Sequence, residues 1–91
     1  MDQKVILLSK KDNVAVAITP LHKGDTIQLD GIKVPVEENI DFGHKISLIN
    51  IKKGQDIIKY GEIIGLATQD IPAGRLVHIH NIKSLRAGKN D

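Results

Sequence analysis

The sequence predicts an all-β domain built from short strands and tight glycine turns. Three observations support this fold class: a glycine motif that occurs three times, an Asp-Gly dipeptide between two alternating apolar runs, and the lack of a helical pattern. No window places apolar residues at helical spacing over about ten positions. Glycine also recurs too often for a long helix, because it is among the least favourable residues in a helix interior.

The repeated motif consists of an aliphatic residue, two variable residues, glycine, two more residues and a second aliphatic residue. Its copies are LHKGDTI at 21–27, IKKGQDI at 51–57 and IPAGRLV at 71–77. Glycine at the same place in each copy indicates a turn that needs positive φ, where a side chain would clash. Each copy therefore predicts strand, tight turn, strand. Chance is the alternative explanation, and three matches make it the weaker one.

The segments between these turns have strand patterns. NVAVAI at 13–18 is apolar on both alternating faces, which is typical of a buried strand. TIQLDGIKVPV at 26–36 contains Asp30-Gly31 between alternating runs, a strong hairpin signal. KISLINI at 45–51 also alternates, and DIIKYGEIIGLAT at 56–68 is interrupted by two glycines. Both are predicted to be extended.

The composition is that of one small globular domain. The chain has 91 residues, of which 41% are hydrophobic and 26% charged. It has no cysteine, which excludes disulfides and thiolate metal ligands. The net charge is +2, and the lysines form no basic block. With only Phe42 and Tyr60 as aromatic residues, a nucleic-acid partner is not expected.

The two ends of the sequence have simple expected roles. The apolar run near the start is only Val5–Leu8, too short for a signal peptide or a membrane span, so a cytoplasmic location and no membrane partner are expected. Residues 1–83 are predicted to form the domain. Residues 84–91 have little apolar content and are predicted to be a mobile tail.

The segment VHIHN at 77–81 contains two of the chain's 4 histidines. As a strand it would direct Val77 and Ile79 toward the core and both histidines outward. The Cβ atoms of the two histidines would then lie roughly 6.5–7 Å apart, at about 3.3 Å per residue.

Three interpretations of this histidine pair stay open. His78 and His80 could bind a metal ion, but a catalytic metal usually has about three protein ligands, so His44 or a partner chain would have to supply another. They could instead contact a polar substrate or partner. The plain alternative is a half-exposed strand face without a role.

Two further clusters have suitable chemistry. GHK contributes His44 and Lys45, and KYG contributes Lys59 and Tyr60, whose side chains would lie on opposite faces of an extended segment. The plain alternatives are solvated lysines and a tyrosine packed at the edge of the core. Together with the histidines, these cations and donors would suit a carboxylate or a polyol.

The motifs DNVAVA, GHK, KYG, IG.AT.DI..G and VH.HN, taken in order, resemble the SAF-type domain that opens the altronate and galactarate dehydratases. The resemblance extends from about Asp12 to Asn81. It implies a β-clip fold, similar to type III antifreeze proteins and to the C-terminal modules of sialic acid synthases.

The resemblance also implies a function. These hydro-lyases remove water from sugar acids with a divalent metal such as iron, and the small domain accompanies a large catalytic portion or subunit. The chain is expected to be a small subunit or N-terminal domain that lines the substrate site and is inactive alone. The positions implied to bind substrate are His44, Lys45, Lys59, Tyr60, His78, His80 and Asn81, with a metal role open for His78 and His80.

Other functions remain as alternatives. A sulfolactate sulfo-lyase uses the same division into small and large chains. A free-standing module that binds sugar acids or glycans is a second alternative. An assembly module of the kind found in flagellar and pilus proteins is a third, which the lack of a signal peptide disfavours. Self-association through an exposed strand edge is a further expectation.

Overall fold

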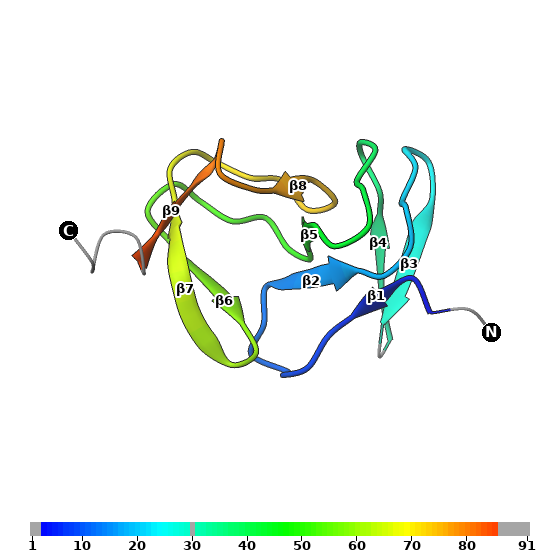
Figure 1. The fold of residues 1–91 in the computed structure, drawn as a ribbon, viewed down its shortest axis with the longest axis horizontal. Helices are drawn as coiled ribbons and strands as arrows, with labels where there is room; N and C mark the ends of the chain where they lie inside the picture. Colours follow the sequence, from blue (N-terminus) through cyan, green and yellow to red (C-terminus); the bar gives the residue numbers. More distant parts are fainter. Residues whose placement is uncertain (1–2, 30, 86–91) are drawn as a thin grey trace.

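A computed structural model describes residues 3–29 and 31–85 of the chain, and this part is entirely β (Figure 1). It contains nine short strands, which confirms the predicted all-β class and is consistent with a small SAF β-clip domain. In chain order they are β1 (Val5–Ile6), β2 (Val14–Ala17), β3 (Thr26–Leu29), β4 (Ile32–Pro35), β5 (Lys45–Ser47), β6 (Asp56–Lys59), β7 (Glu62–Ala67), β8 (Leu76–Val77) and β9 (Ile82–Ser84).

The strands form three antiparallel sheets. A four-stranded sheet has the order β1-β2-β5-β8, β3 and β4 form a hairpin, and β6, β7 and β9 form a third sheet. Figure 1 shows the β3–β4 hairpin at one end of the molecule and the β6–β7–β9 sheet at the other, with the four-stranded sheet between them. The two hairpins therefore extend from a shared centre.

The chain repeats one unit twice, and the two copies overlap. Each copy is a strand, a glycine turn, a hairpin, a second glycine turn and a strand, over 14–47 and then 45–77. Because β5 ends the first copy and begins the second, it belongs to both. The sequence pattern had identified three glycine turns; a fourth, IDFGHKI at 40–46, has the same form and the same bridge-turn-strand structure.

Each glycine turn is bonded to a distant strand end in the same way. The glycine N–H donates to the carbonyl of a distant partner residue. The N–H of that partner donates in turn to the carbonyl of the residue that follows the glycine. The partner is Val36 for Gly24, Ala17 for Gly43, Ala67 for Gly54 and Ser47 for Gly74, with N···O distances of 2.8–3.0 Å. All four glycines have positive φ, between 86° and 98°, as the motif predicted.

The interior has two hydrophobic clusters rather than one. One gathers Ala15, Ala17 and Ile46 with residues of the β3–β4 half, and the other gathers Val14 and Val77 with residues of the β6–β7 half. Successive residues of a strand face opposite sides, so β2 supplies both clusters. This explains why its sequence is apolar at every position and confirms the buried strand predicted there.

The C-terminal boundary differs from the prediction. Ser84 is the last residue of β9 and pairs with Gly65, so it belongs to the folded domain and not to a tail. Residues 86–91 of the predicted tail lie outside the described residues. Within the described residues no helix is long and apolar enough to cross a membrane.

Candidate functional site

The first part of the candidate site is formed where the start of β5 lies beside the end of β8. Lys45 pairs with Val77 in the antiparallel ladder, which brings the residues that flank them together. The rings of His44 and His78 meet edge to face, with centroids 4.8 Å apart at 89°. Both imidazoles are half-buried. The predicted association of GHK with VHIHN is therefore present in the fold.

The strand predicted over 77–81 is wrong beyond its first residue. β8 ends at Val77, and residues 78–81 form a turn. Ile79, expected in the core, is 81% exposed. His78 is half-buried and His80 is exposed, so the two histidines do not share a strand face.

Asn81 is the cause of this turn. Its side-chain oxygen accepts from the backbone N–H of His78 at 2.9 Å, and its amide donates to the carbonyl of Leu76 at 2.8 Å. The residue is only 4% exposed. Both polar atoms of its side chain bond the main chain. Asn81 therefore fixes the orientation of residues 78–81, the histidine turn, instead of extending toward a ligand.

Lys45 adds a cation near His44 and His78. Burial lowers the pKa of Lys45 from its usual range, and the positive charge of Lys59 lowers it further. The pKa of His78 is also lowered, first by burial and then by His44, Lys45 and His80. The charged forms of Lys45 and His78 are therefore disfavoured by burial and by the basic groups around them, which a bound anion would offset.

The second part of the site is the tip of the β6–β7 hairpin. Tyr60 is not in an extended segment: it has φ 57° and, with Gly61 at φ 76°, forms the two-residue turn of the hairpin. The ammonium of Lys59 lies 4.7 Å from the Tyr60 ring centroid, so the two side chains associate and do not diverge as predicted. Tyr60 is 50% exposed and is not packed into the core.

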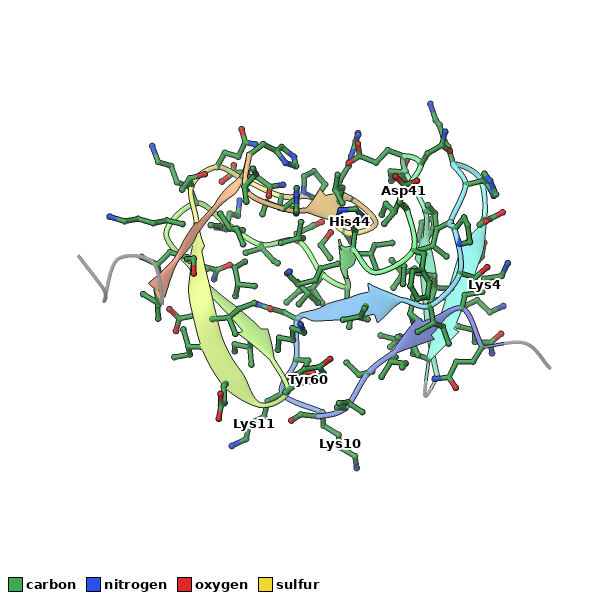
Figure 2. All side chains as sticks on the ribbon, in the orientation of Figure 1. Lys4, Lys10, Lys11, Asp41, His44 and Tyr60 are labelled. Carbon is green, nitrogen blue, oxygen red and sulfur yellow. The ribbon has the colours of Figure 1, made fainter. Side chains whose placement is uncertain are left out.

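The predicted residues do not form one compact pocket. Figure 2 shows His44 above β2 and Tyr60 below it in that view. The electrostatic interaction between Lys45 and Lys59 connects the two parts. The arrangement is a band of basic side chains, and this basic band is defined by His44, Lys45, Lys59, His78 and His80.

The sequence interpretation missed Asp12 and Asn13, which attach the hairpin tip to the centre. Asp12 accepts backbone N–H bonds from Tyr60 and Gly61 at 3.0 and 2.8 Å. Asn13 accepts from Ile58 N–H and donates to the carbonyl of Asp56, both at 2.8 Å. Two adjacent residues with short polar side chains, directly before a buried strand, were the signal for this role.

The basic band has no carboxylate partner among the described residues. Within 3–29 and 31–85 the salt-bridge contact is between His22 Nδ1 and Asp25 Oδ2, at 3.8 Å. It involves none of the five basic groups. Two of the most exposed large apolar side chains flank the histidine pair in sequence: Phe42 at 67% and Ile79 at 81%. The band is thus basic and unpaired within the described residues, and exposed apolar residues lie close to its histidines in sequence.

The donor set does not fit a metal centre by itself. No group of three or more His, Cys, Asp or Glu side chains in the described ranges is arranged to hold a metal ion. His44, His78 and His80 therefore do not form a three-ligand site in this chain.

Curated sugar-acid dehydratases and sulfo-lyase subunits match this sequence. The chain is 42% identical over 79 residues to an altronate dehydratase of Bacillus subtilis and 44% identical over 73 residues to one of Escherichia coli. These matches include 87% and 80% of the chain but only 16% and 15% of the relatives. A (2R)-sulfolactate sulfo-lyase subunit alpha of Paracoccus pantotrophus is 39% identical over 54 residues, 59% of the chain and 81% of that subunit.

The family itself is established by a match along nearly the whole chain. The profile of the altronate/galactarate dehydratase SAF domain matches residues 3–85, which include every strand and every residue of the basic band. The chain therefore belongs to the SAF-domain family of the altronate and galactarate dehydratases.

Proposed function

We propose that this chain is the small domain or subunit of a sugar-acid hydro-lyase of the altronate/galactarate type, and that its basic band binds the acid group of the substrate. The observation that supports this most directly is a set of five basic side chains without a carboxylate partner among the described residues. Membership of the dehydratase SAF family supports the substrate class.

The electrostatics of the band favour an organic anion. Lys45 and His78 are half-buried and surrounded by other basic groups, which lowers both pKa values. A carboxylate placed between them would offset that repulsion and form charge-assisted hydrogen bonds. Imidazole rings can bond the hydroxyl groups of a sugar acid, which have both donors and acceptors.

The reaction itself is assigned to a larger partner, which we propose is the catalytic portion found in the dehydratases. Removing water from a sugar acid requires a base to take the proton beside the carboxylate and an acid or metal to assist loss of the β-hydroxyl. The described residues do not hold a metal on their own, so a divalent ion such as iron would be bound chiefly by the partner. Phe42 and Ile79 would be covered where that partner closes over the band.

The binding role is tested by NMR titration of the full chain with galactarate, altronate and chloride as the control anion. The sugar acids should shift the resonances of His44, Lys45 and His78. Lys45→Ala should weaken binding about tenfold, because a hydrogen bond to a charged group contributes roughly 1.5 kcal/mol. Lys33→Ala is the matched control, since Lys33 is an exposed lysine of β4 in the other half. Equal weakening by both variants, or no shift with any sugar acid, would contradict the proposal.

The assembly role is tested by co-expression with the large dehydratase-family chain of the same organism. The pair should co-purify and dehydrate an aldonate or aldarate, whereas the small chain alone should be inactive. Phe42→Ser with Ile79→Ser should reduce co-purification without changing the fold of the free chain. A pair that forms but acts on no sugar acid would contradict the proposed activity.

The sulfo-lyase is the second candidate, because one of its small subunits matches this chain over 81% of its own length. The same co-expressed pair should then release sulfite from sulfolactate and leave sugar acids unchanged. A third outcome, tight sugar-acid binding by the free chain with no activity in any pair, would indicate a free-standing binding module.

A further inference from the structure

The tip of the β6–β7 hairpin has an unusual backbone for its sequence. Among the described residues, Tyr60 is the only one other than glycine that has positive φ, at 57°. A bulky side chain disfavours this left-handed conformation, which two-residue hairpin turns normally fill with Asn, Asp or Gly. Other interactions must therefore stabilise Tyr60 in it.

The carboxylate of Asp12, which is distant from Tyr60 in sequence, supplies that stabilisation. One oxygen accepts the N–H of Tyr60 at 3.0 Å and the other accepts the N–H of Gly61 at 2.8 Å. Both N–H groups converge on one carboxylate only when the two residues adopt the turn conformation. Ser9 also lies near the turn, since a Cβ added at Gly61 would be in ordinary van der Waals contact with its Oγ, at 3.4 Å.

The conformation of Tyr60 determines where Lys59 lies. With this turn the phenol ring is beneath the Lys59 ammonium, 4.7 Å from the ring centroid to Nζ. A lysine side chain is otherwise free to rotate in solvent, and association with an aromatic ring restricts it. Lys59 is thereby kept near enough to Lys45 to affect its protonation.

We propose that Asp12 is a positioning residue for the basic band: its carboxylate holds the Tyr60–Gly61 turn, and the turn fixes the Lys59 ammonium over the Tyr60 ring, where it can bind the distal end of the substrate. The geometric part of this inference stands on the contacts alone. The part that concerns substrate rests on the proposed function.

The experiment compares Asp12→Ala, Asp12→Asn and Asp70→Ala in the full chain by NMR. Two signals report the geometry: the strong amide-to-α-proton NOE within Tyr60 that positive φ produces, and the upfield ring-current shift of the Lys59 ε protons. Asp70→Ala is the matched control, since Asp70 also accepts one backbone N–H, that of Lys53 at 2.9 Å, in the same half. Thermal unfolding of each variant verifies that the domain remains folded.

Asp12→Ala should abolish both signals and weaken sugar-acid binding about three- to tenfold, while Asp70→Ala should change neither. Asp12→Asn retains one acceptor oxygen and should keep both signals in part. The shift in urea midpoint caused by Asp12→Ala should be smaller when residue 60 is changed by Tyr60→Gly, because glycine adopts positive φ without strain.

The outcomes distinguish the positioning role of Asp12 from the binding of substrate by Lys59. Unchanged NOE and ring-current signals in a folded Asp12→Ala variant would overturn the positioning role. If Asp12→Ala loses both signals and the wild-type chain binds no sugar acid, the positioning role is supported and the proposed function is overturned. Loss of both signals with unchanged sugar-acid affinity would overturn the part of the proposal that assigns Lys59 to the substrate.

Discussion

The two hairpins occupy equivalent places in the two copies of the repeat but are supported differently. The β3–β4 hairpin pairs in an unbroken register from Thr26↔Pro35 to Leu29↔Ile32 and forms a sheet of its own. The β6–β7 hairpin shifts register between Ile57 and Ile58, and β7 pairs with β9 as well. A Cβ added at Gly31 would meet no atom within 4 Å, whereas one at Gly61 would approach Ser9.

This difference shows that the second copy has interactions beyond those of the shared fold. Both copies use the same turns, the same exchanged hydrogen bonds and the same buried positions. The second copy also has an anchored tip with Tyr60, and the histidine turn follows it in the chain. In a repeated fold, the interactions found in only one copy are therefore the ones that folding of the shared unit does not explain.

The largest expected effect tests whether the glycine turns are equivalent. Gly74→Ala should destabilise the domain by about 3 kcal/mol or more, because the new Cβ would clash with the carbonyl oxygen of Pro35 and positive φ would add strain. Gly24→Ala has similar φ, 98°, but open space, so only the strain of about 1–2 kcal/mol applies. Urea unfolding measures both, and equal losses would show that the contact with Pro35 relaxes without cost.

The next effect tests the support of the histidine turn. Asn81→Ala should reduce the free energy of unfolding by about 1–2 kcal/mol, because it leaves partly buried backbone groups of His78 and Leu76 without their side-chain partner. Asn50→Ala is the control: its oxygen accepts the N–H of Ala73, in an exposed turn, and should cost roughly 0.5–1 kcal/mol. If the two variants are equally stable, Asn81 does not hold the turn.

A smaller effect of opposite sign should occur at the hairpin tip. Tyr60→Asn should stabilise the domain by up to about 1 kcal/mol, since asparagine tolerates the left-handed conformation better than tyrosine. The loss of the Lys59 contact with the ring subtracts roughly 0.5 kcal/mol at an exposed site. Chemical denaturation would detect the gain, and a clear destabilisation would mean that the tyrosine ring contributes more than its backbone strain costs.

The smallest effect is a pH dependence confined to the histidine turn. The folded pKa of His78 is lowered from 6.5, so the unfolded chain binds the proton more readily. Stability should be complete above about pH 6.5 and should fall as the pH decreases from there to the lowered pKa. His78→Gln should flatten this slope, and a slope that stays the same would assign it to another group. A bound sugar acid should raise the pKa of His78.

Much of the fold was accessible from the sequence because turn chemistry is local. The glycines of the repeat, the Asp30-Gly31 hairpin and the buried 13–18 strand each follow from neighbouring residues. The fourth turn, at Gly43, has the same motif in the sequence and also contains His44 and Lys45 of the candidate site. Sequence spacing thus predicts the turns, whereas the candidate site residues stay predictions that the family resemblance implies.

The remainder depends on contacts that alternation cannot indicate. VHIHN alternates like a strand, yet the side chain of Asn81 returns to the main chain of His78 and makes a turn. Asp12 and Tyr60 are 48 positions apart, so their contact exists only once both halves are formed. The separation of Tyr60 from His44 likewise follows from the central sheet and from no pattern in the sequence.

The sharing of β5 by both copies has a consequence for how the domain can be divided. A duplicated domain can usually be cut between its copies, but here the cut would remove a strand that each half needs. Ile46 packs in one hydrophobic cluster, while the backbone and hydroxyl of Ser47 bond the last glycine turn. Neither fragment would be expected to fold alone, and the two clusters should melt in a single transition. The repeat is therefore one indivisible folding unit.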